Sequence, residues 1–210
     1  MKSLVATFIR SALVVVLTAG TAMAAELQPM EWRDYAARFI SPEGRVIDTG
    51  NGGISHSEGQ GYGMILAAAF DDRAHFEHLW QWTHRELQVR SDALFGWKWE
   101  PGARKVTDSN SASDGDILIA WALLRADRRW QVPAYRAAAA RILDSVRGRL
   151  IASSPFGPML LPGPQGFQHG DAIVVNPSYW VFPAFSDFAV ADPDPKRIVE
   201  RVYIREFFRP

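Results

Sequence analysis

The sequence predicts an all-α fold of helical hairpins packed side by side, with apolar helices inside and amphipathic helices outside. Apolar residues recur at helical spacing through much of the chain, and segments that are apolar nearly all round alternate with segments that carry one apolar stripe. Loops rich in glycine and proline separate these segments. The chain has 210 residues, of which 48% are hydrophobic, enough for the core of one domain or at most two.

The first 25 residues are predicted to be a secretory signal peptide rather than part of the fold. Lys2 and Arg10 supply positive charge, residues 11–19 form an apolar run, and residues 22–24 (AMA) match the A-x-A cleavage pattern. The run is short for a membrane span, so an uncleaved anchor is the less favoured alternative. The mature protein is therefore expected in a bacterial periplasm or the external medium, with no membrane attachment after cleavage.

Five helices are predicted between residues 29 and 150. The first has its apolar side chains on one face, the second is apolar nearly all round, and the third carries a stripe at i, i+3, i+4 and i+7. A nearly all-apolar helix and an alanine-rich helix follow. In chain order, the predicted helices are residues 29–40, 62–70, 72–88, 117–126 and 134–150.

The remaining segments are predicted to be extended or irregular. Two short stretches, residues 94–99 and 173–175, look extended. Residues 155–170 are predicted to be a loop, because prolines and glycines cluster in SPFGPMLLPGPQG.

Composition excludes several classes of function. Lysine plus arginine equals aspartate plus glutamate at 23 each, so no long-range field favours nucleic acid or an anionic membrane. The chain has no cysteine, which excludes disulfides and thiolate sites, and it has no zinc-type spacing. Eight tryptophans and 12 phenylalanines make it rich in aromatics. These could be core residues, or they could lie against the C–H faces of sugars.

Residues 55–64 (SHSEGQGYGM) place Glu58 among three glycines at the start of an apolar helix. Gly59, Gly61 and Gly63 are poor helix residues, each costing roughly 1 kcal/mol against alanine in a helix interior. Either a neighbouring backbone or a ligand must therefore approach this segment closely. The local sequence leaves both alternatives open.

Residues 111–126 (SASDGDILIAWALLRA) place Asp114 and Asp116 on either side of Gly115, directly before another apolar helix. Taken alone, this pattern favours a helix cap, because an aspartate there accepts hydrogen bonds from free N–H groups and suits the helix dipole. The alternative is an acid–base site. Several carboxylates gathered at one end of a helical core repel each other, and burial raises their pKa values.

Together the two segments resemble glycoside hydrolase family 8, and most closely the endoglucanases that accompany bacterial cellulose synthesis. Residues 112–130 satisfy the family signature at each constrained position. The resemblance covers roughly residues 28–190, and the predicted catalytic domain is residues 26–192. Further matching segments are GRVID at 44–48, FGWKW at 95–99 and NPSYW at 176–180.

The resemblance implies an (α/α)6 barrel with a groove across one end, and hydrolysis of β-1,4-linked polysaccharides, chiefly cellulose. It also implies an inverting mechanism, in which a carboxylic acid protonates the leaving oxygen and a carboxylate activates water on the opposite face of the ring. Two such carboxyl groups stand roughly 6.5 to 9.5 Å apart. The mechanism needs neither a metal nor a cofactor.

By the same resemblance, Glu58 is the proton donor, and its neighbouring glycines leave room for the sugar. Asp114 lies at the ring to be cleaved and is the neighbour expected to raise the pKa of Glu58. Asp116 is the second candidate for substrate binding, weighted towards capping and packing. Others resemble groove aromatics, with a core position as the alternative for each: Trp97, Trp99 and Tyr179. His56 is at best a hydrogen-bonding neighbour of the site.

One element of the family pattern is missing from the chain. Family members carry the general base in a Tyr-Asp-Ala-x-Arg stretch after NPSYW, and only residues 170–173 (GDAI), which precede NPSYW, resemble it superficially. The sequence therefore predicts a barrel incomplete at its C-terminal end, with a divergent tail at residues 193–210. Two functions remain open. The chain is a secreted endoglucanase, monomeric if soluble, or an inactive remnant that binds glucan weakly.

Overall fold

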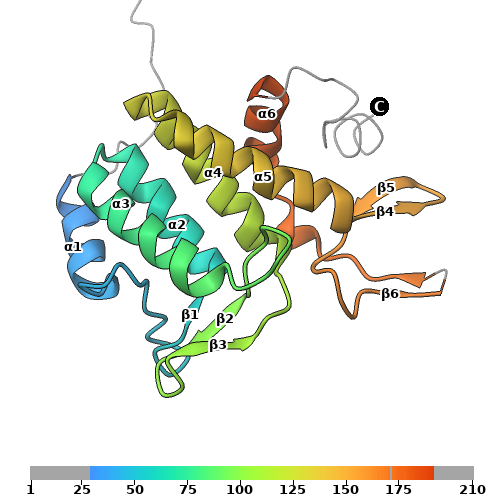
Figure 1. Ribbon diagram of the computed structural model, residues 1–210, viewed down its shortest axis with the longest axis horizontal. Helices are drawn as coiled ribbons and strands as arrows, with labels where there is room; N and C mark the ends of the chain where they lie inside the picture. The colour runs from blue at the N-terminus through green and yellow to red at the C-terminus, as the bar shows by residue number, and fades with distance from the viewer. Residues whose placement is uncertain (1–28, 171, 192–210) are drawn as a thin grey trace, which may run out of the picture.

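The computed structural model describes residues 29–170 and 172–191 (Figure 1). The predicted signal peptide and the predicted tail lie outside the described residues. Two short helical turns accompany the α-helices: η1 (Thr83–Leu87) is a π-helix that continues α3, and η2 (Pro177–Tyr179) is a 3-10 helix. The α-helices are α1 (Pro29–Phe39), α2 (Ser57–Ala69), α3 (Arg73–Trp82), α4 (Ser113–Trp130), α5 (Pro133–Arg149) and α6 (Phe182–Ala191).

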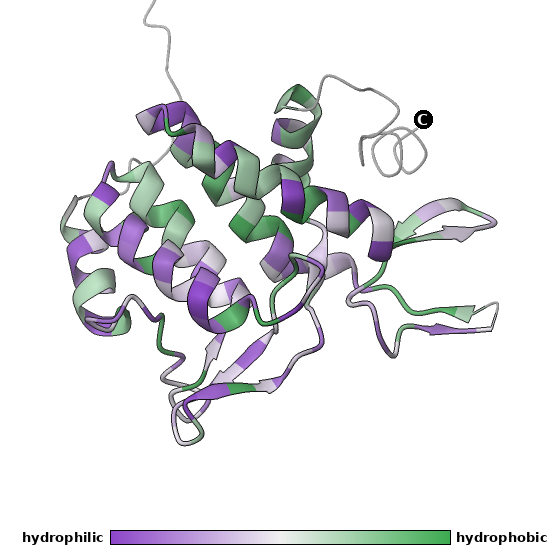
Figure 2. Ribbon diagram, in the orientation of Figure 1, coloured by the Kyte–Doolittle hydropathy of each residue, from purple (hydrophilic) through white to green (hydrophobic). Residues whose placement is uncertain are grey.

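Helices α2 and α4 form the inner pair of the structure. They pack against each other, α3 covers α2, α5 covers α4, and α6 lies against α4 (Figure 1). Most of α4 is buried, whereas α3 and α5 each present a hydrophilic outer face (Figure 2). This arrangement confirms the all-α prediction of apolar helices inside and amphipathic helices outside.

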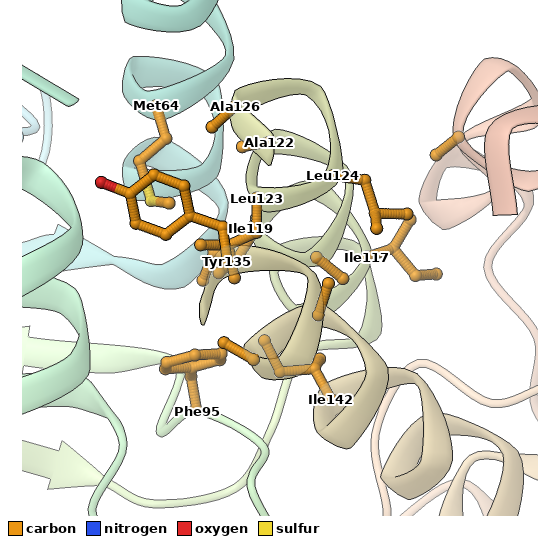
Figure 3. Close-up of a cluster of buried hydrophobic side chains, with 14 of the residues drawn as sticks. Met64, Phe95, Ile117, Ile119, Ala122, Leu123, Leu124, Ala126, Tyr135 and Ile142 are labelled. Carbon is orange, nitrogen blue, oxygen red and sulfur yellow. The ribbon is translucent and has the colours of Figure 1, made fainter. Parts of the chain in front are cut away.

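The hydrophobic core is centred on α4. Ile117, Ile119 and Leu123 are at most 1% exposed, and they belong to one buried cluster with Met64 of α2 and Phe95 of the preceding loop. Figure 3 shows Ile119 and Leu123 on the Met64 side of α4 and Ile117 on the opposite side. Full burial of such a side chain stabilises the fold by about 1.5–3 kcal/mol. This cluster therefore holds the neighbouring elements against α4.

Three small antiparallel sheets join the helices. The first has the order β1-β2-β3, formed by β1 (Ser55–His56), β2 (Lys98–Glu100) and β3 (Lys105–Asp108). It pairs His56 with Lys98 and thereby fixes the 95–99 segment beside the start of α2. The other two sheets are the hairpins β4 (Ile151–Ser154) with β5 (Gly157–Leu160), and β6 (Gln168–His169) with β7 (Ala172–Ile173).

Several predicted boundaries are corrected. Helices α2 and α4 begin earlier than predicted, at Ser57 and Ser113, so both carry their acidic residues in the first turn. The prediction of an irregular loop over residues 155–170 is wrong at residues 157–160 and 168–169, which form strands β5 and β6. The chain turns at residues 155–156, and Gly157 resumes a strand with φ of 103°. Helix α6 was not predicted. No helix among the described residues is long and apolar enough to cross a membrane.

Candidate active site

The site lies where the first turns of α2 and α4 meet, and glycines set that distance. A Cβ on Gly115 would lie 2.1 Å from Ser57 Oγ and 2.9 Å from the backbone nitrogen of Glu58. One turn into α2, a Cβ on Gly61 would lie 2.5 Å from Leu118 Cβ. Real Cβ atoms do not come this close to their neighbours, so only glycine allows the two helices to start in contact.

The same contacts show whether protein atoms or a ligand lie against the glycines of the 55–64 segment. Gly61 faces α4, and a Cβ on Gly63 would lie 2.9 Å from Val46 Cγ2. Both glycines therefore serve close packing inside the protein. The expectation that they leave room for a sugar is corrected, because their open sides are filled by protein atoms.

A cavity of about 560 Å³ opens beside this helix contact. It brings together four of the six residues predicted for the site: Glu58, Asp114, Trp97 and Tyr179. These come from the starts of α2 and α4, from the segment before β2, and from η2. The complete lining is Asp48, Asn51, Ile54, His56, Ser57, Glu58, Trp97, Lys98, Ala112, Asp114 and Tyr179.

The two predicted catalytic carboxyls have different surroundings. The Glu58 side chain is 43% exposed, and its Oε2 lies 3.8 Å from His56 Nδ1. Asp114 is 6% exposed, and its Oδ1 accepts a hydrogen bond of 2.8 Å from the backbone N–H of Gly115. Burial raises the pKa of Asp114 to about 6, and the charge of Glu58 adds to the rise. Asp114 is thus the buried member of the pair, and Glu58 is the exposed one.

Asp116 does not line the cavity. Its side chain is fully buried, where it accepts hydrogen bonds from the Phe95 backbone N–H at 2.9 Å and from the Ser111 hydroxyl. Burial raises the pKa of Asp116 to about 7, although both hydrogen bonds act in the opposite direction. The prediction that Asp116 binds substrate is therefore replaced by the alternative of a packing role. Asp116 anchors the segments around Phe95 and Ser111 to α4.

The three predicted groove aromatics separate into two groups. Trp97 and Tyr179 line the cavity. Trp99 instead lies in the core at 6% exposure, edge-on to Trp82 with ring centroids 5.5 Å apart, and with the Arg45 guanidinium 4.9 Å from its ring. Trp99 thus has the core position that was its alternative, and no face of it is open to a sugar.

Four polar cavity residues were missed as site residues: Asp48, Asn51, Ser57 and Lys98. Asp48 Oδ1 accepts a hydrogen bond of 3.0 Å from the Gly50 N–H, and its Oδ2 accepts one of 2.6 Å from the Asn51 amide. The GRVID segment that ends at Asp48 was a usable signal, because it places a carboxylate at the end of a matching motif. Within the described ranges, no group of three or more histidine, aspartate or glutamate side chains is arranged to hold a metal ion.

A free carboxylate on the far side of the cavity is not found among residues 29–170 and 172–191. The carboxylates that line the cavity are those of Asp48, Glu58 and Asp114. Asp187 lies elsewhere, bonded to Trp121 Nε1 at 2.5 Å and paired with Arg128 at 3.0 Å. The other three late aspartates, at positions 171, 192 and 194, fall outside the described residues.

Comparison with known proteins gives one family. The model of glycosyl hydrolases family 8 matches residues 1–198. An endoglucanase from Cellulomonas uda is 42% identical over 190 residues, covering 90% of this chain and 51% of the relative. The solved structure of the endo-β-1,4-glucanase CMCax from Acetobacter xylinum matches with a TM-score of 0.77 and 40% identity, over 82% of this chain and 55% of that one. Endoglucanase Cel10 from Klebsiella pneumoniae matches with a TM-score of 0.75 and 46% identity, over 77% and 53%. The chain spans about half the length of these relatives.

Proposed function

The chain belongs to family 8 of the glycosyl hydrolases, and from this membership we propose that its cavity is the acid side of an endo-β-1,4-glucanase active site. The described helices form part of the (α/α)6 barrel of that family. One observation carries the proposal: the touching first turns of α2 and α4 hold Glu58 and Asp114 in one open cavity with Trp97 and Tyr179. Residues 26–192 are the proposed catalytic segment.

In the proposed reaction, Glu58 donates its proton to the glycosidic oxygen as the C–O bond breaks, while water adds to the opposite face of the ring. The exposed carboxyl of Glu58 can reach a bound chain from the cavity wall. Asp114, whose pKa is about 6, is mostly ionised at pH 7 and accepts hydrogen bonds from sugar hydroxyls. A general acid of this kind contributes about 10²- to 10⁴-fold to the rate.

A second function, glucan binding without turnover, is favoured by the absence of a free base among the described cavity residues. Inversion requires a carboxylate to activate water. Asp48 is already engaged by Asn51, by the Gly50 N–H and by His56, and Asp114 lies beside Glu58 at the same helix contact. The 210 residues therefore supply the acid, while a Tyr-Asp-Ala-x-Arg base stretch is absent from the sequence.

We further infer that the protein acts outside the cytoplasm as a monomer without membrane attachment. Lys2, Arg10 and the AMA segment at residues 22–24 support export, and the named relatives are bacterial endoglucanases. Fusing residues 1–25 to a reporter enzyme that is active only after export tests the first point, and light scattering of the purified chain tests the second. A reporter retained in the cytoplasm would contradict export.

Calorimetric titration with cellohexaose tests recognition of β-1,4-glucan without requiring turnover. We expect the full chain to bind cellohexaose and the Trp97→Ala variant to bind it more weakly, since that ring lines the cavity. Phe156→Ala is the matched control, because Phe156 is an aromatic residue 79% exposed at the β4–β5 turn and outside the cavity lining. Equal losses in both variants, or no binding by the parent chain, would contradict the proposed recognition.

A further inference from the structure

Helix α2, which carries Glu58 in its first turn, begins with an unusual cap. Asparagine, aspartate, serine and threonine are the preferred N-cap residues, and the chain uses Asp72 for α3 and Asn176 for η2. At the start of α2 the cap is His56, whose Nδ1 accepts a hydrogen bond of 3.0 Å from the Gly59 N–H. A shorter polar side chain would cap the helix equally well, so a second role is needed to account for the imidazole.

The imidazole of His56 is held from two further directions. Its Nε2 lies 3.4 Å from Asp48 Oδ2. The hydrogen bonds to Asp48, that from the Asn51 amide foremost, hold the pKa of that carboxyl below its ordinary value, so it stays ionised. The ring also lies over Gly59, where a Cβ would be 3.2 Å from His56 Cε1. A longer residue at position 59 would displace the ring from this place.

These contacts define the tautomer of neutral His56. Because Nδ1 accepts the Gly59 N–H, the ring proton is on Nε2 and points to Asp48. A second proton would occupy Nδ1, which would then release the Gly59 N–H. A carboxylate oxygen, Oε2 of Glu58, lies 3.8 Å from that new donor.

The other charges facing His56 are of both signs. Asp114 of α4 interacts electrostatically with the His56 ring, and Lys98 of β2 stands opposite His56 in the strand register. The Lys98 ammonium is paired with Glu100 at 2.6 Å, which compensates much of its charge. Three carboxylates therefore face the ring: Asp48, Glu58 and Asp114.

We propose that His56 is a positioning residue that lies between Asp48 and Glu58, and that its protonation state determines how strongly Glu58 is held as a carboxylate. Neutral His56 caps α2 and leaves the Glu58 carboxyl free to carry the proton that it donates. Protonated His56, retained by Asp48 through Nε2, turns its Nδ1–H toward Glu58 and holds Glu58 as the carboxylate. This inference rests on the proposed role of Glu58 as the acid, but its test needs neither glucan nor turnover.

The test is an NMR titration of the full chain that follows the Glu58 carboxyl carbon and the nitrogens of the His56 ring. The ring should be the Nε2–H tautomer when neutral, and the Glu58 signal should show a second step at the pH where His56 takes its proton. His56→Asn keeps a good N-cap, so it should retain the helix while this step disappears.

His75→Asn is the matched control, because His75 forms a similar pair with an aspartate, Asp72, at 2.7 Å, but away from the cavity lining. It should leave the Glu58 titration unchanged. If His56→Asn fails to fold, Asp48→Asn leaves the cap in place and removes the carboxylate that retains protonated His56 through Nε2, so the second step in the Glu58 signal should become smaller. A Glu58 titration that is identical with and without His56, or a neutral Nδ1–H tautomer, would overturn the inference. Either result would leave the glucan-binding test unaffected.

Discussion

Replacing Gly115 by alanine tests whether the helix contact that builds the site depends on that glycine. The new Cβ would lie 2.1 Å from Ser57 Oγ and 2.6 Å from Ser57 Cβ, whereas ordinary contacts begin near 3.4 Å. The first turns of α2 and α4 would have to separate by about 1 Å. Overpacking of this kind typically costs about 1–3 kcal/mol, against which alanine returns up to about 1 kcal/mol of helix propensity. We expect a net loss of about 1–2 kcal/mol, and with it a displacement of Glu58 relative to Asp114.

Thermal unfolding followed by circular dichroism at 222 nm measures this loss. For a chain of this size, 1–2 kcal/mol lowers Tm by about 2–8 °C. Gly148→Ala in α5 is the matched control, because a Cβ there meets nothing within 4 Å and the change should leave Tm equal or slightly higher. If Gly115→Ala unfolds at the same temperature as Gly148→Ala, the two helices do not depend on Gly115 for their contact, and our explanation of the site geometry is wrong.

Two further predictions distinguish the roles of the two aspartates. The pKa of buried Asp114, about 6, lies above its value in an unfolded chain, so its contribution to stability is present below pH 4 and is lost as pH rises through 6. Asp114→Asn should therefore raise Tm at pH 8, by the equivalent of up to about 3 kcal/mol, and leave Tm unchanged near pH 4. The same variant should bind cellohexaose more weakly. An unchanged Tm at pH 8 would contradict the argument that burial raises the pKa of Asp114. Asp116→Ala should lower Tm even at pH 5, where Asp116 is protonated, because the Phe95 N–H and the Ser111 hydroxyl lose their buried acceptor at a cost of about 1–3 kcal/mol. Finding these two phenotypes exchanged would mean that the roles of Asp114 and Asp116 are reversed.

The helices and the placement of Glu58 and Asp114 at the starts of two apolar helices could be predicted from sequence, because both depend on local pattern. Apolar spacing marked the five helices up to residue 150, and Glu58 and Asp114 each precede an apolar run that proved to be an inner helix. The position of Asp116 also follows from pattern, since two residues along a helix turn the side chain by about 200°, away from the face of Asp114.

Tertiary contacts determined what the sequence did not predict. Trp97 and Trp99 are two residues apart, and in a regular strand they would share one face. A register shift between Lys98 and Trp99 separates them, so one lines the cavity and the other enters the core. Likewise, the contact of His56 with Asp48 joins residues whose side chains meet only because the 41–54 loop folds back on the start of α2.

We propose Glu58 as a working acid in a site whose described residues provide no free base. Azide, an anion that needs no base, can replace water: its nitrogen bonds to the anomeric carbon as the glycosidic C–O bond breaks and the leaving oxygen takes the proton of Glu58. The direct measurement is cleavage of cellohexaose by the full chain with and without azide. We predict little or no reducing-end release in buffer alone, azide-dependent formation of shorter glycosyl azides of inverted configuration, and a loss of at least about 10²-fold in Glu58→Gln. Azide-dependent cleavage that is equally fast in Glu58→Gln, or no azide-dependent cleavage by a parent chain that binds cellohexaose, would contradict the claim.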